Sequence, residues 1–539
     1  MSALTALKPG IAWHWAALLL AILFVVLQAP TLGYGTRIND LPHIRDYPVP
    51  ARVAQQSGLE RNTLIGTQTD RTESLDLWMV RFKLYTVDAD EVYAIIALAR
   101  MQPAQFRFDP HYYQYGGVFL YPLGAYYFAL SKLHVLSLGS LEQMLARPDQ
   151  IDRVWIAGRA LILAVVTLAG LALYLALAEF APRPIALAGL AIFYFCPATI
   201  MFSQVLKPHW YALLFTNVAL LILARAFVRQ RLGGAGEIAL GIVLGLAVGS
   251  VATFGLFAVL VWGTLLFLVW QRAARVRTLL SVPIVAVIVF LATNPYYVLS
   301  WQAVQTERAA QSEWFMPALH LGTVPELFRV SILPGFGVVL TVVFLAVLIR
   351  HLLRPAPPGI RLFGLAIFIP LVVMAALTAS HSYWHANFRY FPYVLPLMIV
   401  FLAAAEWPYR KTVLMLTAAA AILQSVPMKL AYVDENSDIH STRLASAAWI
   451  DSRAPAEDAV CTSTNTLAPY SVPPFRFDRH KINTADCRWL VVLDGNQDAK
   501  PPAPGWTLAQ KFRPRLSPAL FPLVWEHINP QVAIYRRAG

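Results

Sequence analysis

The densest group of acids in the chain, Asp88, Asp90 and Glu91, stands at the start of the stretch DADEVYAIIALARM. Apolar residues in this stretch recur with helical spacing, so the acids are expected in the first turn of a helix. A carboxylate in the first turn is stabilised as an anion by the helix dipole. The same placement suits a general base that takes a proton from a hydroxyl nucleophile. Asp90 and Glu91 are therefore candidate catalytic residues, although acids that only charge a helix N-terminus are common.

Three cations stand at the ends of apolar runs and could bind a phosphate. Lys207 and His209 lie in QVLKPHWY, and Arg389 lies in NFRYFPYVLP. An arginine binds phosphate through its planar fork, whereas a lysine acts as a point charge. The alternative for each is a long side chain that reaches from the lipid to the membrane surface, which is routine.

His381 and His385 are four residues apart in HSYWH and would share one face of a helix. The run lacks the glutamate of the HExxH zinc motif, so packing at the membrane interface is favoured over a metal site. No metal ligands are assigned. The candidate substrate-binding residues are the other polar residues on the same predicted face of the membrane: Asp109, His111, Tyr113, Gln114, Asn294 and His385.

The three cysteines leave one alternative open. Cys196 lies in an apolar run, where an unpaired cysteine behaves as a small hydrophobic residue. Cys461 and Cys487 lie in the polar C-terminal stretch, where a disulfide and two unpaired thiols are equally compatible with the sequence. Neither belongs to a CxxC pair, which disfavours zinc.

The elements that must position these residues are membrane helices. Of the 539 residues, 58% are hydrophobic and only 14% are charged, whereas a soluble protein carries about 25% charged residues. Runs near the length that crosses a bilayer predict a polytopic α-helical membrane protein with roughly 11 (11–13) transmembrane helices. The apolar runs lie at 11–30, 115–135, 154–178, 184–203, 209–228, 236–252, 254–271, 278–300, 331–353, 361–379, 387–405 and 412–430.

Arginine-rich loops predict the orientation. The loops that carry Arg225, Arg272, Arg350 and Arg410 are expected in the cytoplasm. The N-terminus is then cytoplasmic and the stretch after residue 430 lies outside. The run at 115–135 cannot be a single crossing, and its tyrosines and glycines suit an interfacial or re-entrant helix. These loops also explain the net charge of +13, and nucleic-acid binding is not predicted.

Two stretches are predicted outside the membrane, at 31–114 and 431–539. In the first, LWMVRFKLYTV is predicted as a strand and DEVYAIIALARM as a helix. In the second, STRLASAAWIDSRA predicts a helix capped by Ser441 or Thr442, and CRWLVVLDG a buried strand. The chain is therefore divided into a membrane domain, 1–430, and a small extracytoplasmic α/β domain, 431–539.

The stretch DADEVYAIIALARM, followed by FDPHYYQYGGVFLYPLGA, resembles the first outer loop of the GT-C superfamily of membrane glycosyltransferases. The resemblance is to the branch of protein O-mannosyltransferases and lipid A aminoarabinose transferases, in which an acidic DE pair begins a helix along the membrane. IDRVWIAGRALILAVV, FLATNPYYVL and FRYFPYVLPLM are similar to later spans of the family, and STRLASAAWI to the start of its soluble tail. The resemblance covers most of the chain diffusely.

This resemblance implies an inverting transfer of a sugar from a polyprenyl-phosphate donor to an acceptor hydroxyl at the extracytoplasmic face. It implies Asp90 as the base, Glu91 as its neighbour or a ligand of metal or substrate, and Lys207 and Arg389 at the donor phosphate. The long stretch before the acidic pair brings Asp40 into contention as the base. Members that use a divalent metal carry a further acid where this chain has VLKPHWY, so a divalent metal is disfavoured but left open as the one candidate cofactor.

The expected partners are the lipid-linked sugar, an acceptor glycan, lipid or protein, and membrane lipids. The expected location is a bacterial inner membrane, with the C-terminal domain in the periplasm. The alternative function is a transporter or flippase of a lipid-linked substrate, although the paired repeats typical of transporters are not evident in the sequence. A non-catalytic assembly scaffold is the third interpretation.

Overall fold

The computed structural model describes residues 9–50, 75–88, 90–312, 324–378, 391–456, 458–463, 467–494, 504–515 and 528–537. The chain forms two compact units, and each is described by itself. The helical unit comprises Met1–Pro30, His111–Leu123 and Ala160–Val426. The sheet unit comprises Thr31–Pro110, Gly124–Arg159 and Pro427–Gly539.

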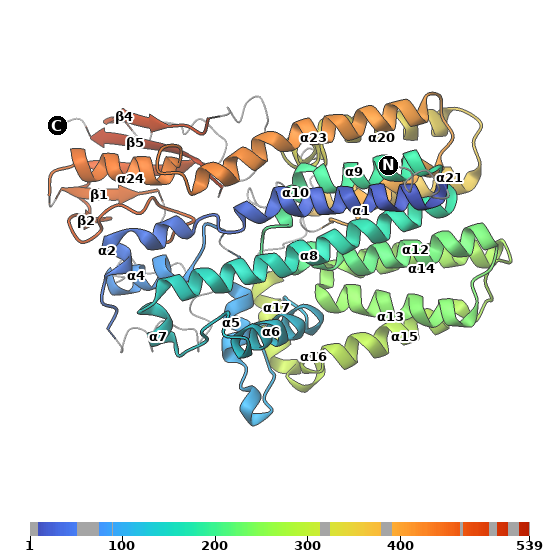
Figure 1. Cartoon of the computed structure of the whole chain (residues 1–539), viewed down its shortest axis with the longest axis horizontal. Helices are drawn as coiled ribbons and strands as arrows, with labels where there is room; N and C mark the ends of the chain where they lie inside the picture. The colour runs from blue at the N-terminus through green and yellow to red at the C-terminus, as the bar shows by residue number, and fades with distance from the viewer. Residues whose placement is uncertain are drawn as a thin grey trace, which may run out of the picture. The chain divides into compact units, whose positions relative to one another are not determined.

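The chain is a mostly helical membrane protein, as its composition predicts (Figure 1). Among the described residues, five helices are long and apolar enough to cross a bilayer: Ala12–Asp40, Pro148–Phe180, Pro208–Arg229, Ala252–Trp270 and Arg410–Glu435. Shorter apolar helices of 10–17 residues lie at Arg183–Phe195, Gly234–Ser250, Thr278–Thr293, Val338–Leu353, Pro358–Val372 and Val394–Ala404.

The helical unit contains most of the apolar helices. It begins with α1 (Pro9–Gln28), and α6 (Gly117–Lys132), α8 (Pro148–Phe180) and α23 (Arg410–Glu435) contribute residues to both units. The remaining helices in chain order are α9 (Arg183–Phe195), α10 (Pro197–Phe202), α11 (Pro208–Tyr211), α12 (Leu213–Arg229), α13 (Gly234–Ser250), α14 (Gly255–Trp270), α15 (Thr278–Thr293), α16 (Tyr296–Leu299), α17 (Trp301–Ser312), α18 (Val324–Leu327), α19 (Leu333–Phe336), α20 (Val338–Leu353), α21 (Pro358–Thr378) and α22 (Val394–Ala404).

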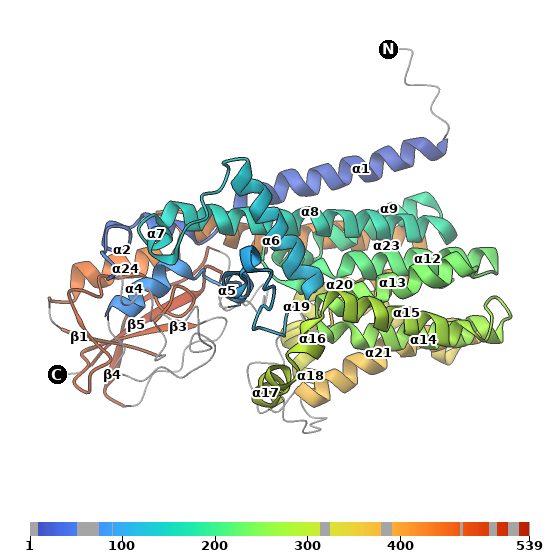
Figure 2. The same cartoon turned by 90° about the horizontal axis from the view of Figure 1, so that it is seen from below.

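Close packing of α13 on α15 depends on two glycines of α13. Figure 2 shows α12 to α15 side by side. A Cβ atom at Gly245 would lie 2.5 Å from the carbonyl oxygen of Ala286, and one at Gly241 would lie 2.9 Å from that of Val282. The missing side chains let the two backbones approach, and such small residues promote helix association in a membrane.

The apolar run predicted at 115–135 forms α6, which contains Pro122 within the helix. It is helical as expected. Its interfacial or re-entrant placement stays a prediction.

The sheet unit carries a mixed five-stranded sheet in the order β2-β1-β3-β5-β4. The three neighbours β2, β1 and β3 are parallel, whereas β3, β5 and β4 are antiparallel. Five residues of β5, Gln531 to Tyr535, are buried. The strands are β1 (Ala459–Thr462), β2 (Lys481–Ile482), β3 (Trp489–Asp494), β4 (Trp506–Phe512) and β5 (Gln531–Arg537).

Short helices complete the sheet unit. They include the 3-10 helix η2 (Thr36–Asp40), α2 (Pro42–Arg45), α4 (Leu75–Leu84), α5 (Val92–Arg100), α7 (Leu141–Leu145) and α24 (Thr442–Arg453). Helix α24 contacts β5 and begins at Ser441, whose hydroxyl oxygen accepts from the backbone N–H of Leu444 over 3.3 Å. The predicted helices α5 and α24 and the predicted strand β3 are confirmed.

The strand predicted for LWMVRFKLYTV is wrong, because residues Leu75–Leu84 form α4. A short run of mixed polarity does not distinguish a strand from a helix by periodicity. In the helix, Asp76 lies in the first turn and Arg81 and Lys83 in the last, which suits the helix dipole. The helix also places the buried ammonium of Lys83 against three backbone carbonyls.

The structure places Cys461 and Cys487 in a disulfide that joins β1 to the residues before β3, with Cα atoms 5.7 Å apart. The sequence left this pairing open. The bond closes a loop of 26 residues within the sheet.

We expect Cys461→Ser to destabilise the sheet unit by about 2–5 kcal/mol, the usual effect of removing a native disulfide. The measurement is thermal unfolding of the purified protein, with thiol alkylation under denaturing, non-reducing conditions to count reactive cysteines. The control is Cys196→Ala, which changes the buried unpaired cysteine. Alkylation of three thiols in the wild-type protein would contradict the disulfide.

Candidate functional site

The acidic pair of the sheet unit is divided between two environments. The side chain of Glu91 is fully buried in an ion pair with Arg159, and both side chains are 0% exposed. Oε1 of Glu91 accepts from Nε of Arg159 over 2.9 Å, and Oε2 accepts from Nη2 over 2.6 Å. The hydroxyl of Thr86 donates to the same Oε2 over 2.6 Å. Both carboxylate oxygens of Glu91 are therefore engaged.

Arg159, from α8, also holds the chain that follows the first apolar helix. Its Nη1 donates to the carbonyl oxygens of Leu32 and Tyr34 over 2.8 and 2.9 Å. Its guanidinium carbon lies 3.6 Å from the centre of the Tyr34 ring, a cation–π contact. One side chain thus ties residues 32–34 to the start of α5.

A hydrogen-bonded turn positions Asp90 beside Glu91. Oδ1 of Asp88 accepts from the backbone N–H of Asp90 over 2.9 Å, which is a typical aspartate turn. The backbone N–H of Asp88 in turn donates to the hydroxyl of Thr86 over 3.1 Å. The side chain of Asp90 is only half-buried, whereas those of Asp88 and Glu91 are buried. Of the two candidate acids, Asp90 is the less buried.

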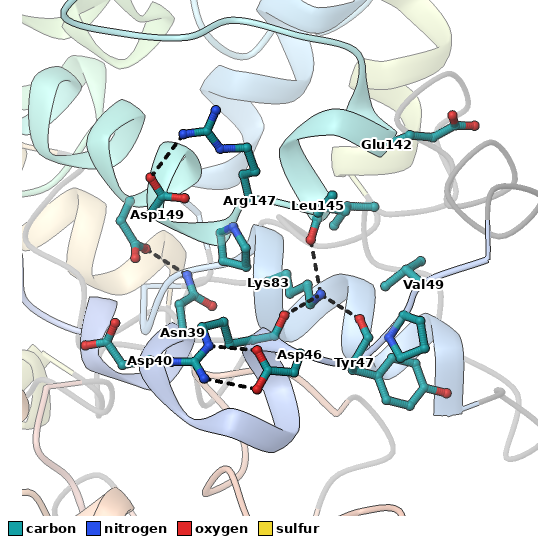
Figure 3. A pocket seen from close by; sticks show the side chains of 15 residues that line it. Asn39, Asp40, Asp46, Tyr47, Val49, Lys83, Glu142, Leu145, Arg147 and Asp149 are labelled. Atoms are coloured by element: carbon teal, nitrogen blue, oxygen red, sulfur yellow. Dashed lines mark hydrogen bonds and ion pairs between the residues drawn. The ribbon is translucent and has the colours of Figure 1, made fainter.

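Asp40, the third candidate base, lies in an exposed ion pair. Its carboxylate is 60% exposed and accepts from Nη1 of Arg37 over 2.9 Å. It also lines a pocket of about 580 Å³ within the sheet unit (Figure 3). We call this the acidic pocket, because its charged residues are Asp40, Asp46, Glu142, Asp149 and Asp152 against Arg45, Lys83 and Arg147.

Asn294, in the helical unit, has a structural set of contacts. Its Oδ1 accepts from the backbone N–H of Gly117 over 2.7 Å, and its Nδ2 donates to the carbonyl oxygen of Phe290 over 3.0 Å. A Cβ at the neighbouring Gly116 would collide with the carbonyl oxygen of Gly249. The stretch QYGG therefore needs its glycines to lie against α13 and α15.

Tyr113 and Gln114 lie in the helical unit, directly before the glycines of QYGG. The backbone N–H of Tyr113 donates to Oε2 of Glu307 over 2.9 Å, and its carbonyl accepts from the hydroxyl of Tyr297. Oε1 of Gln114 accepts from the hydroxyl of Tyr112 over 3.0 Å. His111 is exposed and begins this stretch with a positive φ of 47°.

Lys207 and His209 are buried at the start of α11, 3% and 5% exposed. The ring of Tyr115 packs edge-on against that of His209 at 6.4 Å between centroids. A side chain that reaches the membrane surface would expose its charged end, so the burial of Lys207 disfavours that alternative.

The other sequence candidates are scattered. Asp109 is half-buried in the sheet unit. Arg389 and His385 lie outside the described residues. Within the described ranges, no three His, Cys, Asp or Glu side chains gather in a way that could hold a metal ion.

An apolar groove of about 490 Å³ runs between α13, α14 and α15 of the helical unit. Residues from all three helices line it, and no charged side chain does so. They include Leu244, Gly245, Ala258, Trp262, Val287 and Phe290.

Sequence reasoning missed three residues of the sheet unit that organise these sites: Arg159, Lys83 and Asn39. For Arg159 a signal was present, because an arginine inside a long apolar helix marks a site or a partner by default. For Lys83 and Asn39 no local pattern distinguishes them from ordinary surface residues.

Comparisons with protein-family models, curated proteins and solved structures find no match. The chemistry of these sites therefore follows from their own contacts, burial and charge. A half-buried carboxylate beside a buried ion pair suits proton transfer, and an apolar groove suits a lipid chain.

We expect Arg159→Met to destabilise the protein by about 3–5 kcal/mol, because it leaves the charge of Glu91 buried without its partner. The double variant with Glu91→Gln should recover part of this loss. The measurement is thermal unfolding of the full-length protein in detergent. The matched control is Arg45→Met, which breaks an exposed pair in the same unit and should have no measurable effect. Unfolding of Arg159→Met at the wild-type temperature would show that the pair is not a constraint.

Proposed function

We propose that the protein is a membrane glycosyltransferase that moves a sugar from a polyprenyl-phosphate donor to an acceptor hydroxyl, with inversion at the anomeric carbon. The observation that carries the proposal is the difference in burial between two neighbouring acids at the start of α5. Glu91 is sealed in its pair with Arg159, while Asp90, on the same turn, stays half-buried. A general base needs this combination of a fixed backbone and an accessible carboxylate.

In the proposed reaction Asp90 accepts the proton of the acceptor hydroxyl as its oxygen attacks the anomeric carbon. The bond between that carbon and the phosphate oxygen breaks, and the polyprenyl phosphate leaves with the electron pair. A cation lowers the energy of the charge that develops on the leaving phosphate. The sequence candidates for this cation are Lys207, His209 and Arg389.

The likeness to the GT-C superfamily supports the same proposal. Among the described residues, five helices are long and apolar enough to cross a bilayer, which is compatible with the polytopic architecture that we propose. We place the acidic pair and the C-terminal sheet outside the cytoplasm and the arginine-rich loops inside, in a bacterial inner membrane.

We expect Asp90→Asn to lower turnover about 10²–10⁴-fold, the usual contribution of a general base, while donor binding is retained. The measurement is release of polyprenyl phosphate from the lipid-linked sugars of the source membranes, with donor binding followed separately. Asp40→Asn is the matched control and should leave turnover near wild type. Full turnover by Asp90→Asn would overturn the assignment, and loss in Asp40→Asn alone would transfer the role to Asp40. Movement of the lipid-linked sugar across the membrane by the wild-type protein, with no transfer product formed, would favour a flippase.

The apolar groove supports a donor with a lipid tail, and we propose that the polyprenyl chain lies in it. We expect Ala258→Trp, which fills the groove, to raise KM for a long-chain donor about fivefold or more. A donor with a short isoprenoid chain should be used as before. The matched control is Ile238→Trp on α13, which is 55% exposed and does not line the groove. Equal effects of both substitutions would argue against the groove as the tail site.

A further inference from the structure

The acidic pocket of the sheet unit takes no part in the reaction proposed above. Its walls come from η2, from α2 and the residues after it, from α7 and from the start of α8. At its floor the ammonium of Lys83, 2% exposed, donates to three carbonyl oxygens. The distances are 3.2 Å to Arg45, 2.8 Å to Tyr47 and 3.1 Å to Leu145. Lys83 therefore joins the walls, and all three of its protons are used.

The other cations of the pocket are also engaged (Figure 3). Arg45 donates to both oxygens of Asp46, over 2.8 and 3.0 Å, and this pairing lowers the pKa of the Asp46 carboxyl. Arg147 lies 3.9 Å from the carboxylate of Asp149. Burial lowers the pKa of the Lys83 amine, and its three protons are already donated to carbonyl oxygens. The pocket is thus poorly equipped to bind a phosphate.

Asn39 points to the kind of ligand that the pocket takes. The residue is 6% exposed, and its Nδ2 donates to Oδ1 of Asp152 over 2.7 Å. The carboxylate acceptor fixes which side of the amide carries the nitrogen. Oδ1 of Asn39 is buried and, within the described parts of the chain, has no hydrogen-bond donor. In Figure 3 the side chain of Asn39 lies on the wall of the pocket, with its amide toward the interior.

Acceptors therefore dominate the pocket. Its five carboxylates exceed its three cations, and those cations already have partners. A buried acceptor without a donor is costly, so a ligand that donates to Asn39 is stabilised there. Tyr47 adds an aromatic ring to the wall, and its hydroxyl donates to Asp76 over 2.7 Å. Planar amide and carboxylate acceptors suit the hydroxyl groups of a sugar.

We propose that the acidic pocket binds a saccharide through its hydroxyl groups, with Asn39 and Asp152 as the central acceptors. A volume of about 580 Å³ accommodates a sugar ring or two. Neutral and amino sugars share the hydroxyl chemistry, and an amino group gains from the excess of carboxylates. The proposal rests on the contacts of the pocket alone and does not depend on the transferase reaction.

The test is saturation-transfer NMR on the full-length protein in detergent, with glucose, mannose, arabinose and glucosamine as separate probes, and ³¹P line broadening with inorganic phosphate as the anion probe. We expect at least one sugar to bind and phosphate not to bind. Asn39→Leu should weaken sugar binding about tenfold or more, the effect of one lost buried hydrogen bond. Asp152→Asn keeps the shape of the site and should weaken glucosamine more than the neutral sugars. This second variant keeps the proposal testable if Asn39→Leu does not fold.

Two variants serve as controls. Asp478→Asn changes an exposed acid of the sheet unit that does not line the pocket, so binding should be unchanged. Arg476→Met changes the exposed partner of Asp478, which also does not line the pocket, and binding should again be unchanged. Binding of phosphate, absence of binding by every sugar, or equal binding by wild type and both Asn39→Leu and Asp152→Asn would overturn the inference.

Discussion

The buried ion pair between Glu91 and Arg159 is the constraint on which the chemistry of the sheet unit depends. Burying two charges costs several kcal/mol each, and their attraction offsets this only when geometry and additional hydrogen bonds are good. Here the guanidinium uses two nitrogens on the carboxylate and a third on two carbonyls, and stacks on Tyr34. The pair is therefore satisfied on all sides, and it links three segments that are far apart in the chain.

In the proposed transferase, this constraint gives adjacent carboxylates different roles. Because Glu91 cannot move without exposing a buried charge, the backbone of Asp90 is held in one place. The bond from Asp90 N–H to Asp88 further limits the turn. A base is effective when it is positioned before the substrate arrives, since no reorganisation is then needed during proton transfer. In the proposed reaction, the buried pair of Glu91 would therefore help to position Asp90.

Local patterns predicted local structure well. Helical spacing identified α5 and α24, Ser441 was one of two predicted caps, and the apolar run of β3 was recognised as a buried strand. The misassigned stretch became α4. Its last turn is stabilised by Lys83 through bonds to residues 36 to 62 positions away, which no local spacing reveals.

The partners within the sites could not be predicted for the same reason. Arg159 is 68 residues from Glu91, and Asn39 is 113 residues from Asp152. Candidate residue types are visible in a sequence, but which acid meets which cation depends on tertiary packing. The sequence does not determine whether Cys461 pairs with Cys487, because that depends on the fold bringing their Cα atoms to 5.7 Å.

The Glu91–Arg159 ion pair and the acidic pocket of the sheet unit differ in how far their polar groups are hydrogen-bonded within the protein. At Glu91 and Arg159 every donor and acceptor is matched inside the protein, so the pair holds structure and binds nothing further. In the acidic pocket Lys83 and Arg45 are used by the protein itself. Oδ1 of Asn39 is buried without a donor among the described residues, and it is matched only when a donor enters from outside. In a chain with a net charge of +13, a local excess of carboxylates over cations is the feature from which we infer a preference for hydroxyl groups over anions in this pocket.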